Sequence, residues 1–167
     1  MKTSDFLFDL PESQIAQTPI EPRDHSRMMC INRATGAISH EHFYNVIDHL
    51  QPNDALVINE TRVIPARLYG ERESGGACEV LLLRQIGPKR WETLVRPGRR
   101  LKPGARISFG DGALTAEVLE VCEGGNRLVR FDYEGIFLEK LEQLGKMPLP
   151  PYIKQELEDP ERYQTEI

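Results

Sequence analysis

The sequence predicts a mixed α/β protein, in which a discontinuous α/β domain, incomplete in this chain, is interrupted by an inserted small antiparallel β-barrel. Three observations predict this fold. Residues 69–133 contain short β-rich runs separated by glycine and proline turns. Segments with helical periodicity flank this block at residues 41–50 and 134–144. The run at residues 54–58 is almost wholly apolar, which is typical of a strand that is buried on both faces.

Three parts follow from this pattern. Residues 1–68 are expected to form the first part of the α/β domain, residues 69–133 the inserted barrel, and residues 134–167 a return into the α/β domain. Insertions of this kind are tolerated where the entry and exit ends of the inserted segment lie close together. The α/β part has few helices and strands, so we expect it to be truncated.

The first part of the chain contains several short elements. Residues 10–17 are expected to form a helical turn with Pro11 at its first position. Residues 28–32 and 37–40 are expected to form a hairpin around a turn that contains Gly36. The next segment, residues 41–50, predicts a helix, because its apolar residues follow helical spacing and form one stripe. These residues are Phe43, Val46, Ile47 and Leu50.

The barrel block and the segments after it are also defined by local pattern. Five strands are expected at residues 78–85, 91–96, 106–109, 114–122 and 127–133. A helix at residues 134–144 is expected to end at Gly145. The proline-rich segment 146–153 is expected to be a stiff connector back to the first domain.

Composition bounds the function. A chain of 167 residues buries enough surface to fold without a metal or a disulfide. The net charge of −5 argues against a uniformly basic coat for nucleic acid. Cys30, Cys78 and Cys122 show no zinc-ligand spacing with the histidines, so we expect no metal site and interpret them as small buried side chains. The N-terminus lacks a signal peptide and no apolar run reaches about 20 residues, which predicts a cytoplasmic protein with no membrane partner.

A polar corner follows the expected strand at residues 54–58. Asn59, Glu60 and Thr61 stand where open α/β sheets place ligand-binding groups, and Arg62 and Arg67 flank the apolar run that follows. Pro65 has no N–H for a central ladder, so the sheet should end or reach an edge there. From this stretch alone, an anion-binding corner and a polar turn beside an edge strand with solvated arginines are about equally favoured. Residues 21–27 form a second segment rich in hydrogen-bonding groups.

Positive charge is concentrated in the barrel block. Between residues 84 and 106 there are eight basic residues and a single acid, Glu92. Such a cluster on adjacent hairpins is typical of phosphate contacts, and Trp91 and Pro97 would add a stacking surface. The alternative is a solvated barrel rim, and we favour RNA. The basic residues are Arg84, Lys89, Arg90, Arg96, Arg99, Arg100, Lys102 and Arg106.

Several motifs together resemble one family. The segments 21–27 (Glu-Pro-Arg-Asp-His-Ser-Arg), 59–68 (Asn-Glu-Thr-Arg-Val-Ile-Pro-Ala-Arg-Leu) and 148–153 (Pro-Leu-Pro-Pro-Tyr-Ile) carry the likeness, together with residues 15–17, 79–83, 96–98 and 162–165. The chain resembles the S-adenosylmethionine:tRNA ribosyltransferase-isomerase family of queuosine biosynthesis. Family members are roughly twice as long, so the resemblance is to their N-terminal half.

The resemblance implies a reaction. The ribosyl moiety of S-adenosylmethionine, which acts as a co-substrate and not as a bound cofactor, is transferred to the 7-aminomethyl-7-deazaguanine base at the wobble position of tRNA. The ribosyl ring rearranges to give epoxyqueuosine-tRNA, while adenine and methionine leave. The implied partners are the tRNA anticodon arm and S-adenosylmethionine, and a monomer is expected. The resemblance names no general acid or base, and half of a domain is expected to be inactive alone.

The resemblance also implies binding residues for S-adenosylmethionine or the modified base. Arginine forks suit a carboxylate or a phosphate, and a tyrosine held by prolines suits stacking on a base. For each residue the alternative is a hydrogen-bond network that joins domains. An alternative for the whole chain is a non-catalytic RNA-binding module that uses the basic barrel. The residues are Arg23, Ser26, Arg27, Asn59, Thr61, Arg62, Arg67 and Tyr152.

Overall fold

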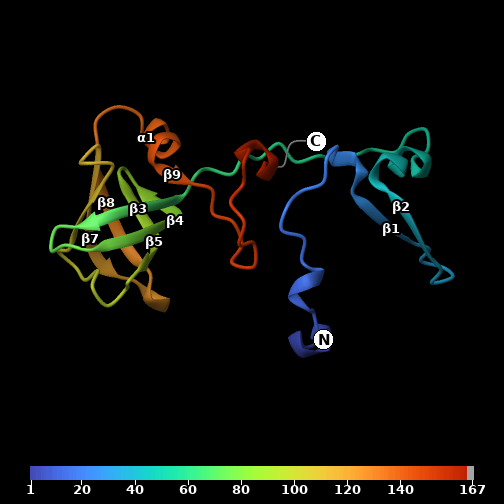
Figure 1. Ribbon diagram of the computed structural model, residues 1–167, viewed down its shortest axis with the longest axis horizontal. Coiled ribbons are helices and arrows are strands. Elements are labelled where there is room, and N and C mark those ends of the chain that lie inside the picture. The colour runs from blue at the N-terminus through green and yellow to red at the C-terminus, as the bar shows by residue number, and fades with distance from the viewer. Residues whose placement is uncertain (165–167) are drawn as a thin grey trace. The chain divides into compact units, whose positions relative to one another are not determined.

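Figure 1 shows the computed structural model of the chain, which describes residues 1–164. The chain divides into two compact units. The hairpin unit combines Met1–Glu60 with Pro150–Arg162. The barrel unit combines Thr61–Leu149 with Tyr163 and Gln164. No helix in the described part of the chain is long and apolar enough to cross a membrane.

The barrel unit contains a closed antiparallel β-barrel of six strands, which confirms the predicted barrel. Hydrogen bonding runs around the ring in the order β3–β4–β5–β8–β7–β6, and β6 pairs with β3 to close it. A short strand, β9 (Gly145–Lys146), pairs antiparallel with the first two residues of β3, Arg67 and Leu68. The barrel strands are β3 (Arg67–Arg72), β4 (Ala77–Gly87), β5 (Arg90–Arg96), β6 (Arg106–Phe109), β7 (Leu114–Val121) and β8 (Arg127–Asp132).

Alternation along the strands fills the barrel with apolar side chains. In β7, for example, Leu114, Ala116 and Val118 are buried, whereas the exposed Thr115 lies between two of them. This period of two is what a strand with one buried face requires. Every buried apolar residue of the described chain belongs to this unit, and the largest are Phe109 and Phe131.

Helix α1 (Phe137–Leu144) packs against the barrel through its apolar stripe. The ring of Phe137 lies 4.9 Å from that of Tyr133 and 5.7 Å from that of Trp91, centroid to centroid. The helix ends at Gly145, as predicted, but the reason differs. Gly145 has an extended backbone, and a Cβ there would overlap the carbonyl oxygen of Pro65. Close approach of two backbones therefore requires glycine at this position.

The hairpin unit is built on β1 (Arg27–Ile31) and β2 (Ile38–His42), which confirms the predicted hairpin. Gly36 has a φ of 73° in the turn, and Asn32 accepts hydrogen bonds from two turn amides. The remaining elements of this unit are short 3₁₀ helices: η1 (Thr3–Phe6), η2 (Glu12–Gln14), η3 (Arg23–His25), η4 (Phe43–His49) and η6 (Pro160–Tyr163), of which only the last residue is assigned to the barrel unit. A further one, η5 (Glu123–Gly125), lies in the barrel unit.

Two predicted elements are wrong. Residues 54–58 form no strand, and Val57 is 91% exposed. The predicted helix at residues 41–50 is instead the end of β2 followed by η4, and Ile47 in its apolar stripe is 70% exposed. The physical reason is the same for both: an apolar run gains stability from regular structure only when a neighbouring surface covers it. The described chain supplies no such surface at these positions.

The broader fold prediction is confirmed only in part. The described residues are mostly β, and α1 is the one α-helix among them. An α/β domain is not seen in residues 1–164, so that part of the fold class stays a prediction. The cysteine interpretation holds for Cys78, which is buried, but is wrong for Cys30 and Cys122, which are partly exposed.

Candidate functional site

A tight turn at the start of the hairpin unit presents three of the predicted binding residues. Helix η3 begins at Arg23 and ends just before Ser26, and β1 starts at Arg27. The hydroxyl of Ser26 donates a hydrogen bond of 2.8 Å to the carbonyl oxygen of Arg23. The Ser26 hydroxyl therefore stabilises the turn, while all three side chains remain exposed.

Three aromatic rings lie beside this turn. His42 and Tyr44 are stacked, with ring planes 3° apart and centroids 5.3 Å apart. His25 meets Tyr44 edge-on at 5.3 Å. The register of the hairpin places His42 opposite Arg27, so the rings and this guanidinium belong to one neighbourhood. Sequence reasoning missed this cluster, because no local period links the three positions.

The proline-rich segment is tied to the N-terminal part of the hairpin unit by Gln17. The side-chain amide of Gln17 donates to the carbonyl oxygen of Tyr152 at 3.0 Å, and its oxygen accepts from the backbone N–H of Lys154 at 2.8 Å. One glutamine thus pairs with the main chain as a neighbouring strand would. This contact fixes the backbone that carries Tyr152, whose side chain is 55% exposed.

A second tie joins the end of the described chain to the motif at residues 21–27. The guanidinium of Arg162 donates a 2.6 Å hydrogen bond to the carbonyl oxygen of Ile20 and forms an ion pair with Glu21. The motif at residues 162–165 and the motif at residues 21–27 are therefore in contact. Thr165 of the former lies outside the described residues.

The second predicted corner is divided between the units. Asn59 belongs to the hairpin unit, whereas Thr61, Arg62 and Arg67 belong to the barrel unit. Asn59, Thr61 and Arg62 lie in an irregular, exposed segment. Arg67 begins β3, and its Nε lies 3.3 Å from a carboxylate oxygen of Glu79 on the neighbouring strand, which favours a role in the barrel wall. A pocket shared by the two corners stays a prediction.

In the barrel unit, the side chain of Gln164 hydrogen-bonds to the main chain in the same way as the side chain of Gln17 does in the hairpin unit. Its side-chain oxygen accepts from the backbone N–H of Val63 at 2.7 Å, and its amide donates to the carbonyl oxygen of the same residue at 3.0 Å. Gln164 is only 4% exposed. Sequence reasoning gave neither glutamine a role, although both lie in motifs that carry the family resemblance. The position of each glutamine within a family motif is the one feature of the sequence that could have pointed to a role for it.

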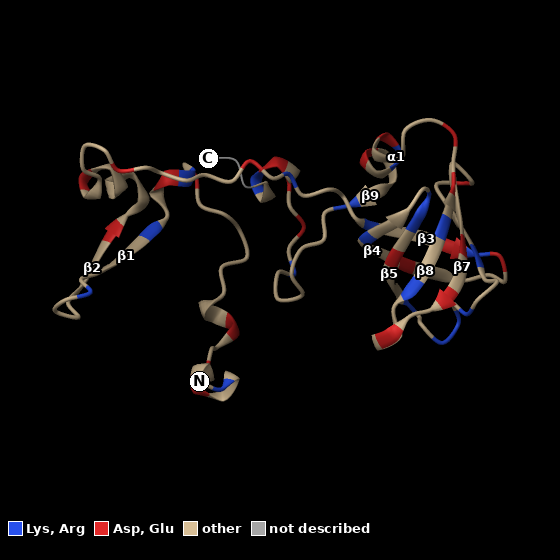
Figure 2. Ribbon diagram, turned by 180° about the vertical axis from the view of Figure 1, so that it is seen from behind, with Lys and Arg blue, Asp and Glu red and all other residues tan. Residues whose placement is uncertain are grey.

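The eight predicted RNA-binding residues are all exposed on the barrel unit. Figure 2 shows basic segments on the barrel strands and on the loops that join them, interleaved with acidic segments. Arg84 is engaged, since it forms a 2.9 Å ion pair with Glu92. Lys89 is also engaged, because its Nζ donates to the carbonyl oxygen of Tyr133 at 2.9 Å and lies 3.5 Å from a carboxylate oxygen of Asp132.

The other six basic residues form no ion pair within the part of the chain that the structure describes. They are Arg90, Arg96, Arg99, Arg100, Lys102 and Arg106. Three of them, Arg99, Arg100 and Lys102, share the loop between β5 and β6. That loop therefore offers the densest group of unpaired positive charge. Trp91, which we expected to provide a stacking surface, packs instead on α1 and is half-buried.

A buried arginine shapes this loop. Arg127 on β8 is 8% exposed, and its guanidinium donates to the carbonyl oxygens of Leu101 at 2.7 Å and Gly98 at 2.8 Å. It also donates to the carbonyl oxygens of Gly125 and Asn126 in the loop before β8. Arg127 thus connects two loops at one end of the barrel and fixes the backbone that carries the basic group. Sequence reasoning missed it, because one more arginine in a strand gives no local signal.

An open groove of about 640 Å³ lies over β3, β6, β7 and β8. Arginines line it, but so do four acidic residues. Arg130 within it forms a 2.6 Å ion pair with Glu117. Because its charges are mixed, this groove is a poorer phosphate site than the loop between β5 and β6.

Comparisons with known proteins are consistent with the motifs. A family model described as "Queuosine biosynthesis protein" matches residues 3–166. An S-adenosylmethionine:tRNA ribosyltransferase-isomerase of Symbiobacterium thermophilum is 57% identical over 166 residues, which cover 99% of this chain and 49% of that protein. The chain thus spans about half the length of this curated relative.

One solved structure is also similar. It is the crystal structure of an S-adenosylmethionine tRNA ribosyltransferase from Thermotoga maritima, with 42% sequence identity and a TM-score of 0.38. The match covers 76% of this chain and 44% of that one.

Proposed function

The chain belongs to the queuosine biosynthesis protein family, and on this premise we propose that it acts as the N-terminal half of an S-adenosylmethionine:tRNA ribosyltransferase-isomerase. The whole enzyme would transfer the ribosyl moiety of S-adenosylmethionine to the 7-aminomethyl-7-deazaguanine base at the tRNA wobble position and isomerise it to give epoxyqueuosine-tRNA. The observation that carries this proposal is the 57% identity to such an enzyme over 99% of the chain. The site of action would be the cytoplasm, where tRNA is modified.

The hairpin unit is proposed to be one part of a discontinuous α/β domain. The exposure of large apolar side chains in this unit, among them Val57 and Ile47, supports this, because exposed apolar surface is typical of an interface. The sequence-predicted bounds of this domain are residues 1–68 and 134–167 around a barrel at residues 69–133, whereas the barrel unit of the structure also takes in the start of β3, helix α1 and β9. The remaining length of the relatives would complete the α/β domain, so the chain alone is expected to be inactive.

Binding of S-adenosylmethionine or the modified base is assigned to the two polar corners. Arg23 and Arg27 would bind a carboxylate or phosphate through their planar forks. Asn59, Thr61 and Arg62 would orient ribose hydroxyls or the base. The contact of Gln17 with the backbone at Tyr152 supports a positioned aromatic ring, which would stack on a base. Ser26 hydrogen-bonds to the backbone of its own turn and Arg67 pairs with Glu79, so we assign both residues to supporting the site and not to contacting the substrate.

The chemistry needs few protein groups beyond these. The sulfonium of S-adenosylmethionine activates the 5′ carbon by itself. The protein must then orient the ribose, hold a base near that carbon and protonate the departing adenine. The anticodon loop must also be opened to present its base. The exposed arginines of the barrel, above all in the loop between β5 and β6, are proposed to bind phosphates of that arm.

A chimera tests the catalytic proposal. The chain is joined to the second half of the Symbiobacterium enzyme, and adenine release is measured with tRNA that carries the aminomethyl precursor. We expect release from the chimera and none from the chain alone. Arg62→Ala in the chimera should lower kcat/KM by about 100-fold, because misplaced reactants lose most of the benefit of orientation. Arg33→Ala, in the exposed hairpin turn, is the matched control and should be unchanged.

The competing function is a non-catalytic RNA-binding module, favoured by the six unpaired basic residues. Salt-dependent tRNA binding by a chimera that never releases adenine would support it and contradict the enzyme. If three side chains contact phosphates of a single strand, log K should fall with log salt with a slope of about −2. Replacing Arg99, Arg100 and Lys102 by alanine should then make the slope nearly flat, and an unchanged slope would exclude this loop from the interface.

A further inference from the structure

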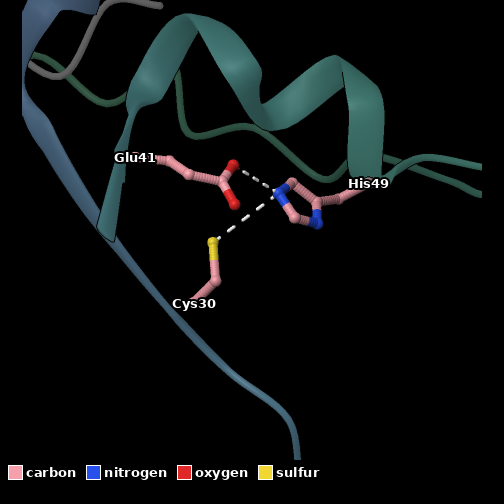
Figure 3. Close-up of side chains that lie close together, drawn as sticks. All are labelled: Cys30, Glu41 and His49. Atoms are coloured by element: carbon pink, nitrogen blue, oxygen red, sulfur yellow. Dashed lines mark hydrogen bonds and ion pairs between the residues drawn. The ribbon is translucent and has the colours of Figure 1, made fainter. Parts of the chain in front are cut away.

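Three potential metal ligands meet in the hairpin unit, outside the residues assigned above. Cys30 lies on β1, Glu41 on β2 and His49 at the end of η4. Figure 3 shows their side chains pointing toward one common point. Nε2 of His49 lies 2.8 Å from a carboxylate oxygen of Glu41 and 3.6 Å from the sulfur of Cys30. One ligand atom from each residue lies within 4.8 Å of the others.

The register of the hairpin explains the meeting. Cys30 faces Ser39 across the strands, and Glu41 faces Met28. Cys30 and Glu41 are therefore diagonal neighbours on one face of the hairpin, close enough for side chains to touch. Helix η4 follows β2 directly and brings His49 back over the same face. Spacing along the sequence hides this arrangement, which is why the sequence predicted no metal site.

The geometry argues against a nucleophilic cysteine. In a catalytic triad the nucleophile and the acid contact different nitrogens of the imidazole. Here Cys30 and Glu41 both contact Nε2 of His49. A cation between the three groups would contact all three ligand atoms, which lie within 4.8 Å of one another.

The distances suit a tetrahedral metal ion. With Zn–S near 2.3 Å and Zn–N near 2.0–2.1 Å, the sulfur and nitrogen of a tetrahedral site lie about 3.6 Å apart. This matches the observed 3.6 Å between Cys30 and His49. The nitrogen–oxygen edge would be about 3.4 Å, so the flexible Glu41 carboxylate would move by about half an ångström. The half-exposed His49 leaves the fourth position to water.

We propose that Cys30, Glu41 and His49 bind one zinc-class divalent cation. A thiolate, an imidazole and a carboxylate select zinc or cobalt over magnesium, which prefers oxygen ligands. The ion would cross-link β1, β2 and η4 in a unit that contains none of the buried apolar residues of the described chain. It would also stiffen the strand that starts at Arg27. The site is structural and does not depend on the proposed function.

Cobalt and zinc binding by the chain test the proposal. After chelator treatment and dialysis, Co²⁺ should bind at one equivalent per chain and give a thiolate charge-transfer band that Zn²⁺ abolishes and Mg²⁺ does not. Loss of a residue that only hydrogen-bonds to a metal ligand weakens metal sites by 10–100-fold, so loss of a ligand itself, in Cys30→Ser and in His49→Gln, should weaken binding by at least about 100-fold. The matched controls Cys122→Ser and His40→Gln should bind as the parent does.

Alkylation provides a second readout that needs no variant to fold. Zn²⁺ should slow iodoacetamide modification of Cys30 by at least about tenfold while leaving Cys122 unchanged, because a coordinated sulfur is not free to react. Circular dichroism of each variant confirms that it is folded. Zinc affinity that is unchanged in both ligand variants, or a Cys30 alkylation rate that zinc does not alter, would overturn the proposal.

Discussion

Arg127 gives the sharpest prediction about the barrel. Arg127→Met keeps much of the aliphatic stem and removes the donors that reach the carbonyl oxygens of Leu101, Gly98, Gly125 and Asn126. Of these four residues, only Leu101 is fully buried, so its carbonyl has the least access to water as a replacement partner. The loss of stability should therefore be largest for the hydrogen bond to Leu101 and smaller for the hydrogen bonds to the other three residues.

The magnitude follows from these partners. A buried acceptor left without a donor costs about 1–3 kcal/mol, and each partner that water can replace costs roughly 0.5–1 kcal/mol. The sum is about 2.5–6 kcal/mol, a large fraction of the stability of an ordinary domain. For a chain of this size such a loss lowers Tm by roughly 5–24 °C.

Trp91 provides the assay. It is the single tryptophan of the chain and lies in the barrel, so its fluorescence during urea unfolding reports on the barrel unit. The control is Arg130→Met on the same strand, which removes one exposed ion pair with Glu117 and should cost less than about 1 kcal/mol. Equal unfolding midpoints for Arg127→Met and the parent would refute the reasoning, as would an equal loss in both variants.

Two further predictions concern single side chains. Gln164→Ala should speed hydrogen exchange at the Val63 amide by about fivefold, because a hydrogen bond contributes roughly 1 kcal/mol; an unchanged exchange rate would contradict this role. Hydrogen bonds from Asn126 and Arg84 lower the pKa of Glu92, so Glu92 stabilises the fold above the ordinary glutamate pKa of about 4.3 and loses that contribution as the pH falls through its lower folded value. Stability curves of Glu92→Gln and the parent should therefore converge in acid, and a constant gap from pH 7 to pH 3 would contradict the assignment.

The sequence by itself determined the barrel strands. Their alternating burial and their glycine or proline turns are local properties, and the predicted ranges lie close to β4, β5, β6, β7 and β8. It also determined the hairpin and the family resemblance. β3 was not among the five predicted strands, because Pro65 suggested that the sheet ends or reaches an edge there, whereas β3 begins two residues later and closes the ring.

Tertiary structure alone decided the rest. The apolar runs at residues 41–50 and 54–58 carry the right pattern for regular elements, but a pattern becomes a helix or a strand only when another surface covers it. Gln17, Gln164 and Arg127 received their roles from main-chain groups that are distant in sequence. Cys30, Glu41 and His49 meet only because the hairpin register and the direction of η4 bring them together. Contacts of this kind depend on how the chain folds back on itself, which the spacing of residue types does not encode.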